Sequence, residues 1–419
     1  MTIALDNPFL LSLGILVFLL LVKKPEIALA IEFNGTFIYF YLIYKLGMEP
    51  SPLLTGSFHA FLAISYILGG MLVHKKYKFR VSSIDLIFIV FFLIVFLSYL
   101  ILGKTSTKIA YAPLLVIAPY FGIQLLGSEK KIKNFFNYCI IVTAILIVPA
   151  FYELLFNPIF AESARYSMYM LEGGKDNPIL FGMTIAVLLI ILFILVLEQK
   201  KLKFKYLILI VPSLFLLLRS GSRGSTISFL VTMLFYILII ERLKFKTKVY
   251  ALILLAFLIL GTYKFIPEST IEFYKYTFTP EARIRESSSV YQRLVLIQEA
   301  FSDIKKSPIW GIGTGNSAGG YGSPHNILLE VLVEWGVIGL FIFLLLCYLT
   351  IKTALSFLRE EEQQDLNLLM KLSFVLFIYF LVRSMVGGYV TQYTGFFVSM
   401  GLISILGKIR KPPYSRIVL

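Results

Sequence analysis

The sequence predicts an all-α, polytopic helical membrane protein, and three observations support this fold class. Of the 419 residues, 58% are hydrophobic and only 15% are charged, and the mean hydropathy is +0.85. Soluble domains carry about 25% charged residues, so this composition excludes them. Apolar runs of about 20 residues recur from end to end, each long enough to cross about 30 Å of hydrocarbon. A β-barrel would show short segments of alternating polarity instead.

The apolar segments predict about 12–13 transmembrane helices in a single integral membrane domain, residues 1–419. They lie at 8–22, 25–46, 53–73, 84–102, 108–127, 135–156, 179–198, 204–218, 225–240, 249–266, 326–351, 369–383 and 389–407. No small-residue cleavage site follows the first segment, so we interpret it as a retained helix. Cys139 and Cys347 fall inside predicted helices, and we expect neither a disulfide nor a metal site from them.

Basic residues are concentrated in every second loop, which is the signal that orients helical membrane proteins. The basic segments are 23–24, 74–80, 129–133, 200–205, 242–248 and the tail 408–416. We therefore place these loops and the C-terminus in the cytoplasm, and the intervening loops outside it. Most of the lysines and arginines behind the net charge of +15 lie in these orienting loops. We therefore predict no nucleic-acid partner.

Two of the outward loops are longer than a turn, namely 157–178 and 267–325. In the longer loop, the serines of 287–289 offer N-cap groups. Apolar residues then follow at a spacing of three to four: Val290, Leu294, Ile297, Phe301 and Ile304. This spacing predicts one amphipathic helix, which Lys305, Lys306 and Pro308 end. We expect the Gly-rich stretch 311–322 to be irregular and close to the membrane.

His325 is the strongest candidate for chemistry, because it lies where the long polar loop meets a hydrophobic helix. An imidazole can accept a proton near neutral pH. A lone histidine at a helix start is more often structural than catalytic, and the position of His325 among outward arginines favours the catalytic interpretation. Of the other histidines, His74 lies in a basic cytoplasmic loop, and we interpret His59 as a packing or polar-pair residue.

Five arginines lie at outward membrane-edge positions: Arg165, Arg219, Arg223, Arg293 and Arg383. Arg219 and Arg223 flank a turn of Gly and Ser residues, whose backbone N–H groups and following helix start can face an anion. A guanidinium group binds phosphate oxygens in a bidentate manner, through two parallel N–H···O hydrogen bonds. Each arginine alone could instead reach the lipid headgroups or solvent. Together with His325, they predict a site for an anionic, lipid-linked substrate.

Several motifs of cofactor chemistry are absent from the sequence. It contains no Walker A segment, no His-Glu-x-x-His pair and no Cys-x-x-Cys pair. Gly311, Gly313 and Gly315 follow Pro308 and open no βαβ unit, so they are not a nucleotide fingerprint. We predict that the protein uses no cofactor and no metal.

Four segments make the chain similar to the O-antigen ligase and O-antigen polymerase superfamily of bacterial membrane glycosyltransferases. They are 219–225 (RSGSRGS), 290–299 (VYQRLVLIQE), 308–313 (PIWGIG) and 323–340 (SPHNILLEVLVEWGVIGL). The family pattern is a Pro-x-x-Gly-x-Gly turn, a His-Asn pair, and a helix with Glu and Gly-x-x-Gly. It falls here on Pro308, Gly311, Gly313, His325, Asn326, Glu334, Gly336 and Gly339.

The resemblance implies a fold similar to the C-type glycosyltransferases and a metal-independent transfer of a glycan. The donor would be an oligosaccharide on undecaprenyl or another polyprenyl diphosphate, and the acceptor a glycolipid, on the outer face of the bacterial cytoplasmic membrane. His325 is the expected general base, and Arg223 and Arg293 are expected to hold the diphosphate. Arg165, near Asn177 and Pro178, resembles a further family arginine. We add Arg219 to the diphosphate site and Asn326 and Arg383 as supporting residues.

Two activities within the family fit these residues. A polymerase joins one lipid-linked repeat unit to another and works with a chain-length regulator protein, whereas a ligase passes the glycan to lipid A-core. We favour the polymerase, because such enzymes serve more kinds of cell envelope. A flippase for lipid-linked oligosaccharides is a third alternative, although transporters tend to show internal repeats and ionisable groups near mid-membrane. A structural scaffold would leave the outward histidine and arginines unexplained.

Overall fold

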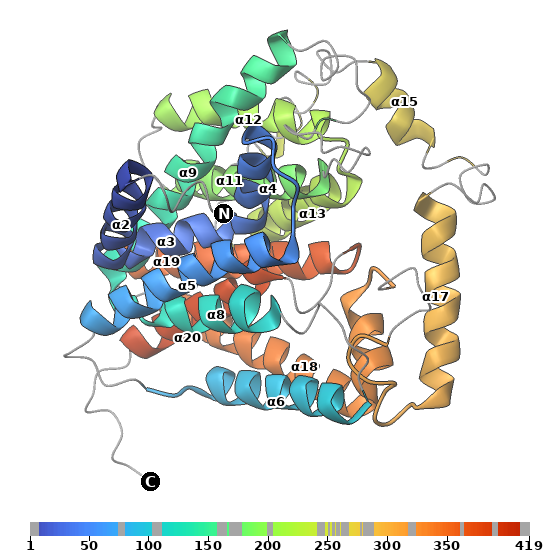
Figure 1. Ribbon diagram of the computed structural model, residues 1–419. Coiled ribbons are helices and arrows are strands. Elements are labelled where there is room, and N and C mark those ends of the chain that lie inside the picture. Colours follow the sequence, from blue (N-terminus) through green and yellow to red (C-terminus); the bar gives the residue numbers. More distant parts are fainter. Residues whose placement is uncertain are drawn as a thin grey trace.

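The computed structural model describes most of the chain, and every element in the described residues is a helix (Figure 1). These residues are 8–73, 80–102, 111–156, 166, 178–198, 204–240, 248–249, 252–253, 256, 260, 268–276, 279, 289–316, 324–360, 364–387 and 393–410. The predicted all-α class is confirmed.

The helices follow the apolar segments closely. They are α2 (Pro8–Lys23), α3 (Pro25–Phe33), α4 (Gly35–Lys45), α5 (Pro52–Val73), α6 (Ser83–Leu102), η1 (Pro113–Ile117), α8 (Ala118–Gln124), α9 (Glu129–Phe156), α11 (Pro178–Glu198), α12 (Phe204–Arg219), α13 (Arg223–Phe235), η2 (Tyr236–Ile240), α15 (Glu268–Tyr276), α17 (Ser289–Lys306), α18 (Ile327–Arg359), α19 (Gln364–Ser384) and α20 (Thr394–Arg410).

Within the described ranges, seven helices are long and apolar enough to cross a membrane, or eight if the bent pair α3 and α4 is one span. The polytopic architecture is therefore confirmed. The predicted number of about 12–13 spans is larger. Three further apolar helices are short (Gly14–Lys23, Pro113–Gln124 and Tyr206–Arg219), and α20 has only 17 residues. Most of the predicted span 249–266 lies outside the described residues.

The predicted span 25–46 is broken in the structure. α3 and α4 meet at Asn34 with a bend of 80°. The side chain of Asn34 donates to the carbonyl of Ala30 (3.4 Å), as expected of a short polar side chain that competes with the helical ladder. Gly35 follows, and a Cβ there would lie only 3.1 Å from the ring of His59. The break therefore brings α3 and α4 against α5 without a clash.

α18 is kinked at Gly336, which has φ 63° and ψ −164°. The loop after α17 fills this kink: Ile312 N donates to the carbonyl of Val333 (2.9 Å), and Val337 N donates to the carbonyl of Pro308 (2.9 Å). These bonds satisfy backbone groups that the kink removes from the helical ladder. The Pro-x-x-Gly-x-Gly turn thus fastens the end of α17 to α18.

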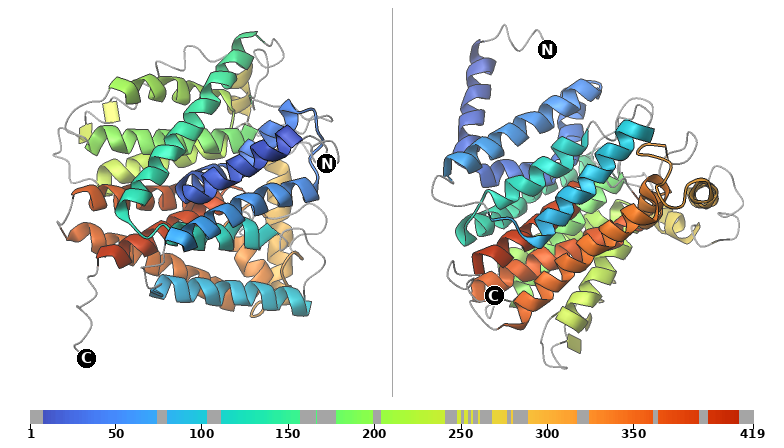
Figure 2. Two further views of the ribbon diagram at one scale, coloured as in Figure 1. Left: turned by 60° about the vertical axis from the view of Figure 1, so that its left-hand side comes forward. Right: turned by 90° about the horizontal axis from the view of Figure 1, so that it is seen from below.

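The predicted loop helix is present as α17, which runs across the ends of the long helices at one end of the bundle (Figures 1 and 2). It buries Leu296 and Ala300, with 4% and 1% of their surface exposed, and leaves Leu294 and Phe301 exposed. α17 therefore packs on the bundle through one side and presents an apolar side outward.

Ion pairs connect helix ends and loops at the end of the bundle opposite α17. Lys408 pairs with Asp85 (2.6 Å), and Lys133 pairs with Asp365 (2.9 Å). These residues belong to loops or helix ends that the basic-residue pattern places together on one side. α6 and α18 lie along the bundle between this end and the end where α17 lies (Figure 1).

Candidate active site

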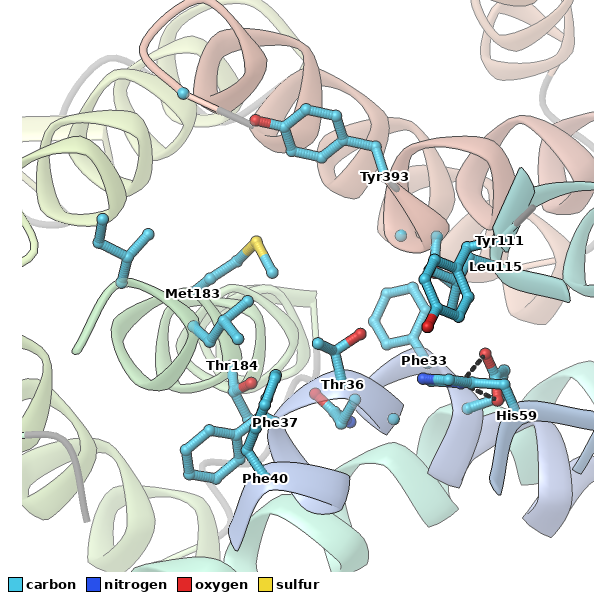
Figure 3. A pocket seen from close by; sticks show the side chains of 18 of the residues that line it. Phe33, Thr36, Phe37, Phe40, His59, Tyr111, Leu115, Met183, Thr184 and Tyr393 are labelled. Atoms are coloured by element: carbon cyan, nitrogen blue, oxygen red, sulfur yellow. Dashed lines mark hydrogen bonds and ion pairs between the residues drawn. The ribbon is translucent and has the colours of Figure 1, made fainter. Parts of the chain in front are cut away.

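A cavity of about 580 Å³ opens between the N-terminal helices and the C-terminal half of the bundle. Residues of α3, α4 and α5 form one wall, and residues of α11, α19 and the start of α20 form the others (Figure 3). His325, Arg293 and Arg383 all line this cavity, as does His59. The cavity size lies within the range of about 300–1,000 Å³ that small-ligand sites occupy.

His325 is held at the start of α18 by local hydrogen bonds. Its φ of 54° is the one positive value at a non-glycine position in the described part of the chain. Asn326 then caps α18, because its Oδ1 accepts from the N–H groups of Leu328 (3.0 Å) and Leu329 (3.1 Å). The Nδ2 of Asn326 donates to the carbonyl of Met385 (3.3 Å) just after α19. This bond places His325 beside the end of the helix that carries Arg383.

The environment of His325 keeps its imidazole neutral. Burial lowers its pKa, and the charges of Arg293 and Arg383 lower it further. A histidine with a pKa below its ordinary value of about 6.5 is unprotonated at neutral pH. It can therefore accept a proton, which is the property that a general base needs.

Arg383 is the buried cation of the cavity, with 5% of its surface exposed. Its Nε and Nη1 have no hydrogen-bond partner among the described residues. Gly224 and Gly387 lie directly against the guanidinium, since a Cβ at either would be 3.3 Å or 3.1 Å from Nη1. Buried charges are normally paired, so this arrangement fits an anionic ligand.

Two further residues bring polar groups to the same place. Arg293 reaches the cavity from α17, although that helix lies across the end of the bundle. Tyr393, just before α20, is 7% exposed and its hydroxyl has no hydrogen-bond partner in the described structure. Burial raises the pKa of Tyr393 to about 12, so its hydroxyl remains a donor. Sequence reasoning missed Tyr393, because one tyrosine among 25 carries no signal.

The turn 219–225 lies next to this cluster. Arg223 begins α13, and its neighbour Gly224 touches the guanidinium of Arg383, but neither Arg223 nor Arg219 is among the described residues that line the cavity. Arg219 is 1% exposed and donates to the hydroxyl of Thr270 on α15 (2.7 Å). Arg165 lies outside the described residues. A role for these three arginines in diphosphate binding stays a prediction.

Residues 207–344 match the model of a family described as O-antigen ligase. This match covers about a third of the chain and supports the resemblance to the O-antigen ligase and polymerase superfamily. Among curated proteins, none matches the chain. The matched segment contains Arg219, Arg223, Arg293 and His325. Arg383 and the cavity wall from α3, α4 and α5 lie outside it, so the family model covers only part of the site.

Proposed function

We propose that this protein moves a glycan from a polyprenyl diphosphate carrier to a hydroxyl of a glycan acceptor, as a surface polysaccharide polymerase. One observation carries the proposal: His325, Arg293 and Arg383 line a single cavity, although they come from three different elements. A neutral base beside two fixed cations suits a reaction in which an alcohol loses a proton and a diphosphate leaves.

The cationic residues would hold and stabilise the leaving group. Guanidinium groups of Arg383 and Arg293 bind the diphosphate, with the backbone of the turn at Arg223 beside them. As the bond between the anomeric carbon and the diphosphate oxygen breaks, its electron pair passes to that oxygen. Fixed positive charges in the cavity stabilise this developing charge.

His325 would act on the acceptor. Its imidazole takes the proton of the acceptor hydroxyl as the oxygen forms the new bond to the anomeric carbon, which inverts that carbon. General base catalysis contributes about 10²–10⁴-fold, so charge stabilisation and positioning supply the remainder. The step needs no metal and no nucleotide sugar.

The proposal includes a side of the membrane and partners. The end of the bundle with α17 and the cavity would face outward from the bacterial cytoplasmic membrane, and the C-terminus would face the cytoplasm, because the basic loops lie toward the latter. The lipid bilayer, a glycolipid acceptor and a chain-length regulator protein are the partners that this activity needs.

Incubation of the purified protein with lipid-linked repeat units alone tests the polymerase. We expect a ladder of products on a gel, together with released polyprenyl diphosphate. The description of the matched family favours a ligase as the second candidate. A ligase would form product only after lipid A-core is added, and a flippase would release no polyprenyl diphosphate under either condition.

A further inference from the structure

The cavity contains a second buried histidine that the proposed transfer does not use. His59 on α5 is 1% exposed, and its Nδ1 lies 2.9 Å and 3.1 Å from the two carboxylate oxygens of Glu32 on α3, which is also 1% exposed. The interpretation of His59 as a polar-pair residue is thus confirmed. Its place on the cavity wall is what sequence reasoning missed.

The other ring nitrogen of His59 is directed into the cavity. Nε2 is buried and has no hydrogen-bond partner in the described structure. Figure 3 shows a nitrogen of the ring on the side away from Glu32, facing the open space that Thr36 also lines, with Tyr393 across the cavity. A buried polar atom without a partner is destabilising, so a bound hydrogen-bond donor would stabilise Nε2.

The wall around His59 is rich in hydroxyl, amide and aromatic groups. Hydroxyl and amide side chains come from Asn34, Thr36, Ser51 and Thr55, and aromatic rings from Phe33, Phe37, Phe40 and Tyr111. Glu32 is the single carboxylate among the described lining residues, and it is bonded to His59. His59 lies about two helical turns, or about 10 Å, from the start of α5 at 1.5 Å per residue.

This chemistry selects a neutral ligand that carries hydroxyl groups. The one carboxylic acid among the described residues of this wall is bonded to His59, and Arg293 and Arg383 hold the diphosphate in the proposed function, so hydroxyl groups of a neutral ligand suit the rest of the wall. With Nδ1 beside Glu32, the tautomer that carries its proton on Nδ1 donates to the carboxyl group and leaves a lone pair on Nε2 for a donor in the cavity. A hydroxyl group can fill this role, and it could also accept if the ring were protonated. Most ligand sites combine apolar and aromatic walls with a few placed polar groups, as here.

We propose that His59, held by Glu32, forms a subsite for a sugar residue, with Nε2 accepting a hydrogen bond from a sugar hydroxyl. The inference rests on the proposed function, because that function brings a saccharide beside the arginines. A glycine at position 35 leaves room for this pair, since a Cβ there would lie 3.1 Å from Cε1 of His59 and 3.4 Å from Glu32 Oε2. The subsite would hold the sugar attached to the diphosphate or the sugar that bears the acceptor hydroxyl.

The test uses the double variant Glu32→Leu/His59→Leu in lipid nanodiscs. Removing both partners avoids leaving a buried charge unpaired, so this variant is expected to fold. The probes are undecaprenyl diphosphate and the lipid-linked saccharide extracted from the cells that make the protein. We expect the double variant to bind the saccharide-loaded lipid about ten-fold more weakly, or to show a KM for the acceptor raised by about ten-fold, as the loss of one buried hydrogen bond allows. Binding of undecaprenyl diphosphate should not change.

Two further variants complete the experiment. Ser65→Ala, on the same helix, removes a buried hydroxyl that bonds only the carbonyl of Phe61 in the described structure (2.7 Å), and it should match the wild type in every measurement. His59→Gln keeps a polar group at the subsite and should recover part of the saccharide affinity. The subsite is refuted if the double variant retains both the donor affinity and the acceptor KM. If the wild type binds neither lipid, the proposed function itself is wrong.

Discussion

His325 and His59 line one cavity, but their neighbours differ in charge. His325 shares its surroundings with Arg293 and Arg383, which lower its pKa and keep it neutral. His59 is paired with a carboxylate, Glu32, which orients its ring. The comparison teaches that the neighbour decides what an imidazole can do: cations prepare it to accept a proton near a leaving anion, whereas a carboxylate fixes it as a hydrogen-bonding group.

The comparison predicts its largest effect at His325. We expect His325→Ala to reduce transfer by about 10²–10⁴-fold, because the acceptor hydroxyl loses its base. Binding of undecaprenyl diphosphate should persist, since the arginines remain. Release of polyprenyl diphosphate from the lipid-linked saccharide measures the first effect, and a direct binding assay measures the second. Undiminished transfer by a folded variant would remove His325 from the mechanism.

Arg383→Gln should have the next largest effect. The variant removes charge-assisted hydrogen bonds, each worth about 1.5–3 kcal/mol, so undecaprenyl diphosphate should bind about 10–100-fold more weakly. Arg359→Gln is the matched control, because Arg359 is exposed at the far end of α18. Equal affinities of the two variants would show that Arg383 does not contact the diphosphate.

The pH dependence of transfer tests how the cationic neighbours of His325 affect its pKa. His325 must be unprotonated to act, and its pKa is lowered, so kcat/KM should stay high as the pH falls to about 6.5 and decline only below it. Arg383→Gln removes one cause of the lowered pKa and should move this decline to higher pH. A profile that does not move between the two proteins would argue against electrostatic coupling of Arg383 and His325.

The smallest effect is expected beside His59. A Cβ at Gly35 would lie 3.1 Å from Cε1 of His59 and 3.4 Å from Glu32 Oε2, so Gly35→Ala must displace the ring slightly. We expect the lipid-linked saccharide to bind about three-fold more weakly, which corresponds to about 0.6 kcal/mol. Gly56→Ala on α5 is the control, because nothing lies within 4 Å of its added Cβ. If both variants bind alike, the position of His59 does not matter to the ligand.

Local patterns predicted the apolar helices, the loop helix and the place of His325 at a helix start, but not how many of those helices are long enough to span the membrane. Hydropathy and apolar spacing are properties of neighbouring residues, so α17 and the long helices could be read from them. The break between α3 and α4 could not be predicted in this way, because it depends on the packing of Gly35 against His59, 24 positions along the chain.

The arginines show the same limit at the site. Arg219 and Arg223 flank one turn and look equivalent in sequence, but Arg219 is bonded to Thr270 on α15. Arg383 carried a weak signal by itself, and it becomes central only because Asn326 ties the start of α18 to the residue after α19. Convergence of residues from distant helices is a tertiary property that no local pattern records.

The most direct test of the account is the position of the diphosphate, determined by cryo-electron microscopy of the protein in nanodiscs with undecaprenyl diphosphate. We predict that its phosphate oxygens lie within about 2.7–3.2 Å of guanidinium nitrogens of Arg383 and Arg293, with His325 beside the anomeric position. A diphosphate bound outside this cavity, away from both arginines, would contradict the account.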